Sequence, residues 1–135
     1  MNFLGLDPGR DKCGLAVVDD RQYILFRAVV PAADTLAQLS ALVERFTPET
    51  LILGNQTTAR EWLARVQTHF GGRPAVVLID ERHSTLEARQ RYWQLHPPRG
   101  LQCLLPEGLR VPPVPVDDLV AVLLIERYLA TRGAG

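Results

Sequence analysis

The chain has 135 residues, a length that fits one domain and is too short for two domains of ordinary size. Apolar residues make up 47% of the chain and charged residues 22%, which is typical of globular proteins and excludes a disordered chain. The formal net charge is zero, which excludes a strongly basic nucleic-acid coat and a polybasic membrane binder but leaves room for a local basic face.

The first third of the chain predicts three consecutive β-strands. Apolar runs occupy residues 3–7, 13–18 and 22–30, and the polar residues 19–21 form a turn between the second and third runs. No stretch long enough for a crossover helix separates these runs. We therefore expect an antiparallel meander.

Helices and strands alternate in the next part of the chain. Asp34 is placed to cap a helix that ends at residues 47–49, and an apolar strand follows at 51–54. Thr58 opens a second helix with capping-box spacing, and Gly71 ends it. Residues 75–79 form another apolar run, and we expect this strand and the one at 51–54 to be buried.

The last part of the chain predicts two helices separated by a loop. The first opens at Ser84 with a second capping box and is closed by Pro97 and Pro98. Six of the ten prolines lie between Pro97 and Pro115, which indicates an irregular loop, and a final apolar helix runs from Asp117 to about Leu129. The element order predicts an α/β fold: one domain over residues 1–135, with a mixed five-stranded sheet of three antiparallel and then two parallel strands, and helices on both faces.

Acidic side chains fall at the ends of these elements. Asp7 ends the first strand, Asp80 and Glu81 follow the last strand, and Asp117 and Asp118 begin the final helix. Sites in α/β folds collect at strand ends, and carboxylates are the ligands that Mg²⁺ prefers. Each acid also has a structural interpretation: Asp7 as a turn former, Glu81 as a surface ion pair, and Asp117 or Asp118 as a helix cap.

Three blocks of sequence resemble one family. Residues 4–17 (LGLDPGRDKCGLAV), 80–85 (DERHST) and 117–124 (DDLVAVLL) resemble, in this order, the opening, the Asp-Glu-Arg block and the acidic helix start of the YqgF/RuvX family. Members of that family are described as Holliday junction resolvases and as pre-16S rRNA nucleases. The sequence departs from the family at residues 54–58, where Gly-Asn-Gln-Thr-Thr replaces Gly-Leu-Pro and a Gly-containing turn.

The resemblance implies an RNase H-like fold and a metal-dependent endonuclease that produces 5′-phosphate and 3′-hydroxyl ends. Asp7, Glu81 and Asp117 would hold Mg²⁺ or Mn²⁺, with Asp80 and Asp118 as further candidates. Gly9 and Gly14 would permit a tight turn and close backbone approach. The substrate stays open between the rRNA precursor and branched DNA, and a branched substrate with two equivalent strands favours a symmetric homodimer.

A modest basic tilt accompanies these acids. Residues 59–99 hold seven cations against four acids, together with all three histidines. The resemblance implies contacts to the nucleic-acid backbone from Arg10, Lys12 and Arg82, and the charge pattern adds His83 and Arg89 as candidates. Arg89 and Arg91 lie beside Tyr92 and Trp93, a combination that binds backbone and stacks bases, although both aromatic residues also fit a core position. His83 fits equally a surface or capping role.

The remaining features indicate a soluble, cytoplasmic protein. Cys13 and Cys103 are expected to be small buried or half-buried side chains, because neither belongs to a metal-spaced pair. The first residues have no basic segment of a signal peptide, and no apolar run is long enough to span a membrane. Two other functions stay open: a nucleic-acid-binding module of the same fold with weak chemistry, and a nucleotide-binding fragment of the actin-like ATPase class.

Overall fold

The computed structural model describes residues 1–55, 58–80, 84–96 and 116–133. Three strands open the chain: β1 (Asn2–Asp7), β2 (Lys12–Asp19) and β3 (Ile24–Pro31). β2 pairs antiparallel with both β1 and β3. The predicted meander is therefore confirmed. The proline-rich loop expected at residues 97–115, which includes Cys103, lies outside the described residues.

Two parallel strands complete the sheet. β4 (Thr50–Gly54) pairs with β1, and β5 (Ala75–Ile79) pairs with β4, so that the strand order is β3-β2-β1-β4-β5. The predicted mixed five-stranded sheet is confirmed. Because β1, β4 and β5 are parallel, their carboxyl ends lie at one edge of the sheet.

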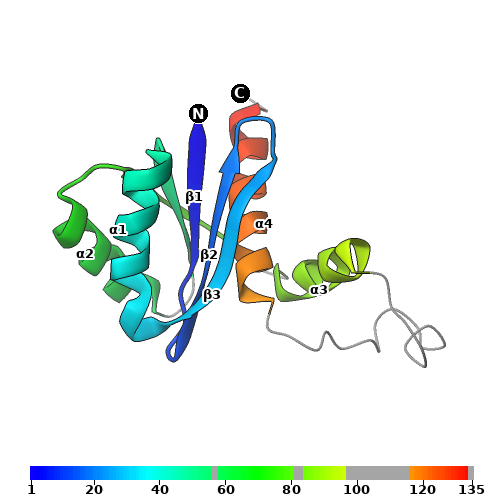
Figure 1. The fold of residues 1–135 in the computed structure, drawn as a ribbon, viewed down its shortest axis with the longest axis horizontal. Coiled ribbons are helices and arrows are strands. Elements are labelled where there is room, and N and C mark those ends of the chain that lie inside the picture. Colours follow the sequence, from blue (N-terminus) through cyan, green and yellow to red (C-terminus); the bar gives the residue numbers. More distant parts are fainter. Residues whose placement is uncertain (56–57, 81–83, 97–115, 134–135) are drawn as a thin grey trace.

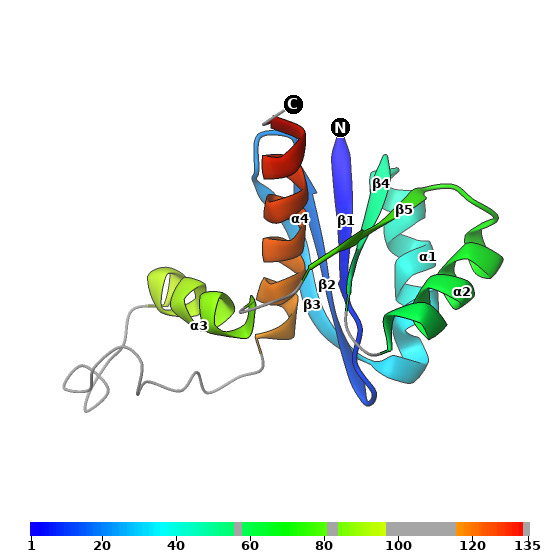
Figure 2. The same ribbon diagram turned by 180° about the vertical axis from the view of Figure 1, so that it is seen from behind.

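Helices cover both faces of this sheet (Figures 1 and 2). A 3-10 turn, η1 (Ala32–Asp34), leads into α1 (Thr35–Phe46), which packs with α2 (Ala59–Phe70) on one face. On the other face α4 (Asp117–Gly133) crosses the strands, and α3 (Ser84–Leu95) packs against α4. Among the described helices none is long and apolar enough to cross a membrane.

The two faces follow from the alternation of side chains along the strands. In β1, Leu4 and Leu6 point toward α1 and α2, where they pack in an apolar cluster with Leu39 and Trp62. The intervening residue Phe3 packs against α4 in a second cluster. Large apolar side chains on α1 and α2 thus fill the first face completely.

Small residues line the strands under α4. Residues 119–125 of this helix are buried, as an apolar helix between a sheet and another helix must be. Gly5 lies beneath it, and a Cβ there would come within 2.5 Å of the carbonyl oxygen of Ala121. Ala16 in β2 is likewise small and fully buried. The helix therefore approaches the sheet closely, and it continues beyond the predicted end at Leu129.

Strand β5 is not buried, and our prediction was wrong on this point. Ala75 is exposed, and Leu78 is 44% exposed. The apolar run suggested a strand covered on both faces. The strand instead lies at the edge of the sheet, beside β4. An apolar composition does not distinguish an edge strand from a central strand.

The predicted side-chain caps are absent from the first two helices. Asp34 and Thr58 occupy the positions before α1 and α2, but neither side chain makes a capping hydrogen bond. Both residues have near-helical backbone angles (φ −95°, ψ −4° and φ −89°, ψ 2°) instead of the extended conformation that a capping side chain requires. The predicted end of α2 is confirmed, because Gly71 adopts the left-handed conformation and its N–H donates to the carbonyl of Gln67.

Candidate functional site

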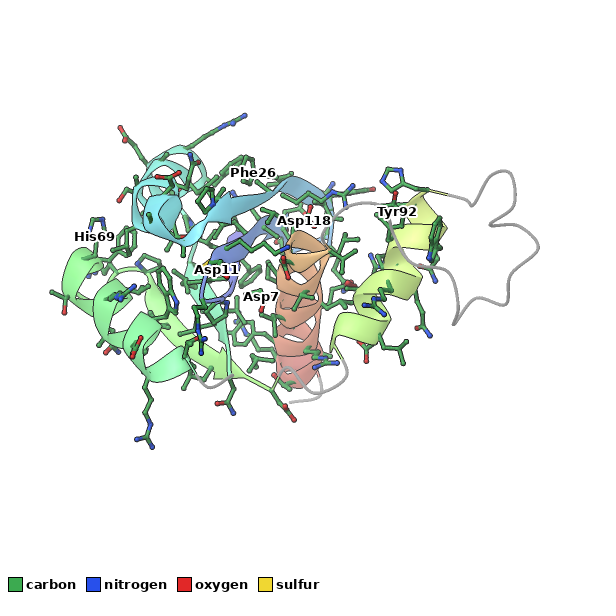
Figure 3. All side chains as sticks on the ribbon, turned by 90° about the horizontal axis from the view of Figure 1, so that it is seen from below. Asp7, Asp11, Phe26, His69, Tyr92 and Asp118 are labelled. Carbon is green, nitrogen blue, oxygen red and sulfur yellow. The ribbon has the colours of Figure 1, made fainter. Side chains whose placement is uncertain are left out.

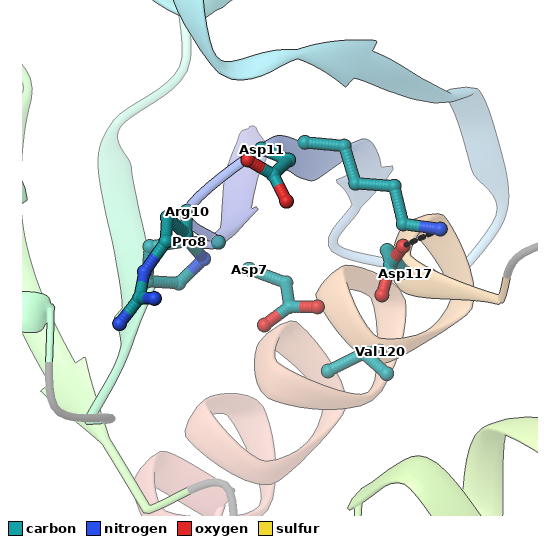
Figure 4. Close-up of a pocket in the computed structure, with 8 residues that line it drawn as sticks. Asp7, Pro8, Arg10, Asp11, Asp117 and Val120 are labelled. Carbon is teal, nitrogen blue, oxygen red and sulfur yellow. Dashed lines mark ion pairs between the residues drawn. The ribbon is translucent and has the colours of Figure 1, made fainter.

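A pocket of about 270 Å³ lies at the carboxyl end of β1 (Figure 4). Two stretches of chain line it: the turn between β1 and β2, and the first residues of α4. The lining residues are Asp7, Pro8, Gly9, Arg10, Asp11, Lys12, Asp117 and Val120. Residues more than a hundred positions apart in the sequence therefore share one site, and four of the predicted site residues are among them.

The backbone explains why Asp7 and Asp117 meet. Asp7 lies on the α4 face of β1 because it follows Phe3 and Gly5 at intervals of two. Its partner across the antiparallel pair is Gly14. A Cβ at Gly14 would overlap the backbone of Asp117. The absent side chain at Gly14 thus lets the start of α4 rest on β2 beside Asp7, as the predicted close approach required.

The two carboxylates differ in their surroundings. Asp7 is buried, with 8% of its surface exposed, and its carboxylate points into the pocket toward Asp117 (Figure 4). Oδ2 of Asp117 is buried and has no hydrogen-bond donor among the described residues. Nζ of Lys12 lies 3.5 Å from this oxygen, which is close enough for an ion pair but lacks the geometry of a hydrogen bond. A buried carboxylate oxygen without a hydrogen-bond donor costs folding free energy unless a cation compensates its charge.

These oxygens fit a hard divalent cation. Carboxylates are the ligands of Mg²⁺ and Mn²⁺, and an oxygen without a donor has a lone pair available for one. No group of three His, Cys, Asp or Glu side chains in the described parts of the chain is close enough to hold an ion together. Glu81, the third predicted ligand, lies outside the described residues.

Asp118 does not line the pocket. Its Oδ1 accepts a hydrogen bond from the backbone N–H of Leu119 at 2.9 Å, and its Oδ2 lies 3.9 Å from Nε of Arg27 on β3. Burial raises the pKa of this carboxyl, although the Arg27 guanidinium opposes the shift. Viewed from below, Asp7, Asp11 and Asp118 gather where the strands meet the start of α4 (Figure 3). The side chain of Asp118 thus contacts the backbone of the first turn of α4 and Arg27 of β3.

Asp80 follows β5 directly and its side chain is exposed. Its backbone carbonyl accepts a hydrogen bond from Nη1 of Arg127 at 2.7 Å, while Nη2 of Arg127 contacts Oε1 of Glu87 at 2.9 Å. One arginine of α4 thus anchors the end of β5 and the first turn of α3. Asp80 is absent from the pocket lining.

The predicted nucleic-acid contacts divide into three groups. Arg10 and Lys12 line the pocket and are exposed. Arg89 is exposed on α3 and does not line the pocket. Arg82 and His83 lie outside the described residues. Arg10 and Lys12 are therefore the two predicted contacts that lie beside the carboxylates of the pocket.

The aromatic residues of α3 are half-buried, in line with a core position. Tyr92 packs against the cluster under α4 and meets Trp93 edge to face, with 5.0 Å between ring centroids. Arg91 points to α4, where Nη2 lies 2.6 and 2.7 Å from the two carboxylate oxygens of Glu126. An ion pair within the fold therefore occupies Arg91.

Sequence reasoning missed one charged residue of the pocket. Asp11 lies at the tip of the turn, and its carboxylate faces the pocket (Figure 4). Its place in the turn that joins β1 to β2 is no sufficient signal, because an acid there is also typical of a turn former. Cys13, which follows, is buried as predicted.

The fold is RNase H-like, and solved structures that share it include RuvC and a viral Holliday junction resolvase. The RuvC structure from Thermus thermophilus is 20% identical over 98% of this chain and 97% of that chain, with a TM-score of 0.61. T. thermophilus RuvC in complex with a Holliday junction substrate is 22% identical over 98% and 96% of the two chains, with the same TM-score. The Fowlpox virus resolvase in complex with Holliday junction DNA is 12% identical over 98% and 99%, with a TM-score of 0.64.

At these identities the likeness establishes the fold. No protein-family model and no curated protein matches the chain. The finer assignment to the YqgF/RuvX family therefore stays a prediction from its three sequence blocks.

Proposed function

We propose that this chain is a divalent-metal-dependent endonuclease that cleaves branched DNA. The observation that supports it most is the pairing of Asp7 and Asp117 in one pocket at the carboxyl edge of the sheet. Similar solved structures include a RuvC protein and a viral resolvase, each in complex with a Holliday junction. Structured RNA, including the rRNA precursor that the sequence resemblance implies, is the alternative substrate.

Asp7 and Asp117 would hold the ion, and Glu81 is proposed as the third ligand. The topology favours this set, because Glu81 follows β5, which ends at the same edge as β1. When bound, a divalent cation supplies a water of lowered pKa and stabilises the charge that develops on the phosphate. Asp7 is buried, which restricts the orientations that its carboxylate can adopt.

The cations at the pocket mouth would bind the nucleic-acid backbone. Arg10 and Lys12 are exposed beside the carboxylates and carry the charge that a phosphate requires. Arg89 on α3 would extend this contact along the strand, and Arg82 and His83 remain proposed contacts from the sequence. Because the chain is neutral overall, binding should weaken steeply with added salt.

A junction has two strands to cut, so we propose that the chain acts as a homodimer. Two copies related by a twofold axis would present two equivalent pockets to two equivalent strands. Light scattering of the purified protein, alone and with a four-way junction, measures this directly. A monomer that cuts both strands of one junction in a single binding event contradicts the proposal.

Cleavage of defined substrates tests the function. A labelled four-way junction, the matching linear duplex and a structured RNA are incubated with Mg²⁺ or Mn²⁺. We expect the wild type to cut the junction, and Asp7→Asn and Asp117→Asn to lose more than about 100-fold in rate, because losing even an outer-shell partner costs about 10- to 100-fold. Asp20→Asn, the same chemical change at an exposed turn, is the matched control.

The outcomes separate the alternatives. Equal cutting by wild type and Asp7→Asn removes the nuclease assignment, since the activity would then belong to a contaminant. Tight junction binding without cutting in either metal supports a binding module. Preferential cutting of the RNA assigns the site to rRNA processing. Loss of activity in Asp118→Asn with retention in Asp117→Asn would move the ligand by one residue.

A further inference from the structure

Lys12 is the only lysine of the chain, and it pairs with a residue of the pocket. Its Nζ lies 3.5 Å from Oδ2 of Asp117, the buried oxygen that lacks a hydrogen-bond donor among the described residues. Within that part of the chain it is the one cation paired with this carboxylate. Lys12 therefore offsets the charge of Asp117 in the metal-free protein.

The backbone of Lys12 is fixed, whereas its side chain is not. Lys12 begins β2 and pairs in register with Pro31. A Cβ at Gly9 would overlap the carbonyl oxygen of Lys12, so the turn that carries both residues is tight. The side chain is 52% exposed and ends in a flexible stem of four carbons. The ammonium can thus leave Asp117 by rotamer changes alone.

A divalent cation and this ammonium compete for the same oxygen. Asp7 and Asp117 face one pocket, and an ion held between them would place two further positive charges beside Nζ. Like charges about 4 Å apart repel by about 1 kcal/mol or more per charge pair, depending on the local dielectric. The lysine must therefore move out when the ion enters.

We propose that Lys12 is the exchangeable counter-ion of Asp117. It neutralises the carboxylate in the metal-free protein, leaves it when a divalent cation binds, and is then free to contact a phosphate at the pocket mouth. The proposal rests on the proposed function, since it takes Asp117 as a metal ligand. It gives Lys12 two successive partners, and it couples cation binding to the binding of the nucleic-acid backbone.

Removing the lysine should strengthen cation binding. We expect Lys12→Met to lower the Kd for Mn²⁺, measured by electron paramagnetic resonance without nucleic acid, by about fivefold, since partly exposed ion pairs contribute up to about 1 kcal/mol. Lys12→Arg should stay within about twofold of wild type because it keeps the charge. Arg10→Met is the matched control: it removes a pocket cation that is not paired with Asp117, and we expect about twofold or less.

A direct readout needs no substitution at Lys12. Because the chain has one lysine, ¹³C-labelled lysine gives a single assigned ε-methylene signal. Saturating Mg²⁺ should shift this signal in the wild type and leave it in place in Asp117→Asn. Mg²⁺ is used here because Mn²⁺ broadens nearby signals.

The failures are distinguishable. If the wild type binds Mn²⁺ and Asp117→Asn does not, but the lysine signal is unmoved by Mg²⁺ or Arg10→Met tightens binding as much as Lys12→Met, the exchange is wrong and the proposed function stands. If Asp117→Asn binds Mn²⁺ as tightly as the wild type, Asp117 is not a ligand, and both proposals fall together.

Discussion

The two faces of the sheet differ in how closely a helix approaches the strand backbone. Toward α1 and α2 the strands present large apolar side chains such as Leu4 and Leu51, which are completely buried. Toward α4 the same strands present Gly5, Gly14 and Ala16 beside larger residues such as Phe3 and Ile52, and at the glycines the helix rests almost directly on the backbone. The face toward α1 and α2 (the apolar face) is thus held by side-chain volume, and the face toward α4 (the close face) combines apolar packing with close backbone approach.

The difference explains where the pocket lies. A helix that rests on glycine brings its own first turn to the strand end, so Asp117 reaches Asp7 without a long side chain in between. On the apolar face an acid at the equivalent position would be buried against leucine, at a high cost in free energy. The pocket therefore lies where α4 approaches the strands closely, and not on the face packed by α1 and α2.

The largest effect should come from the apolar face. We expect Leu51→Ala to lower the free energy of unfolding by about 2–5 kcal/mol, because it leaves a cavity among side chains that cannot collapse. Mn²⁺ affinity of the folded variant should not change. Denaturant unfolding measures the loss of stability, and a Mn²⁺ titration at low temperature measures the affinity. A weakened Mn²⁺ affinity would show that the two faces are not independent.

A substitution on the close face should lower both the stability of the protein and its Mn²⁺ affinity. Gly14→Ala places a Cβ in the backbone of Asp117, so α4 must shift, at a cost of about 1–3 kcal/mol in unfolding free energy. We expect Mn²⁺ affinity to fall as well, because Asp117 moves with the helix. The same two measurements apply, with Leu51→Ala as the control for lost stability. Unchanged affinity in Gly14→Ala contradicts the close-approach account.

Substitutions at the ends of α1 and α2 should have smaller effects on stability, of opposite sign at the two helices. Both helices end in a left-handed residue: Thr47 with φ 43° and Gly71 with φ 66°. We expect Gly71→Ala to destabilise the protein by about 1 kcal/mol and Thr47→Gly to stabilise it by about 0.5–1 kcal/mol, since only glycine adopts this conformation without strain. Thermal unfolding measures both. Mn²⁺ affinity should not respond to either variant, because both positions lie outside the pocket lining.

The smallest effect concerns pH. Burial raises the pKa of Asp118 above its ordinary value, so the folded protein holds this proton more tightly than the unfolded chain. Stability from this group is therefore present at low pH and is lost as pH rises through the folded-state pKa. Relative to Asp118→Asn, the wild type should gain stability as pH falls through that window.

Neighbouring charges define the control for this pH effect. Arg27 and Asp117 face Asp118, and His96 lies against Arg27 with 3.5 Å between nitrogen atoms. Asp118→Asn keeps all of these neighbours, so the difference between wild type and variant isolates the carboxyl of Asp118. Urea unfolding of both proteins across the acid range gives this difference. A difference that is constant with pH would contradict the raised pKa.

The sequence predicts the fold well where local pattern decides it. Alternation and turn residues located β1, β2 and β3, and the spacing of strands and helices gave the parallel pair. The exposure of β5 was missed because an apolar run does not reveal whether a strand is central or at an edge. The caps at Asp34 and Thr58 were wrong because backbone angles, which the residue type does not fix, decide whether a side chain caps.

The candidate site could be predicted in part. Asp7 and Asp117 were named because they lie at the end of a strand and the start of a helix and match the family resemblance, and both line the pocket. Asp11 was missed, since nothing in its sequence context separates a pocket carboxylate from a turn former. The different roles of Asp117 and Asp118 depend on which way each side chain leaves the first turn of α4, and neighbouring acids in a sequence do not reveal this.

One measurement tests the central claim most directly: a crystal of the protein soaked in Mn²⁺ and examined by anomalous scattering. The account predicts one anomalous peak within about 2.3 Å of carboxylate oxygens of both Asp7 and Asp117, a distance typical of hard divalent cations. Such a peak on Asp118 or Asp11 instead, or no peak near Asp7 at saturating Mn²⁺, would contradict it.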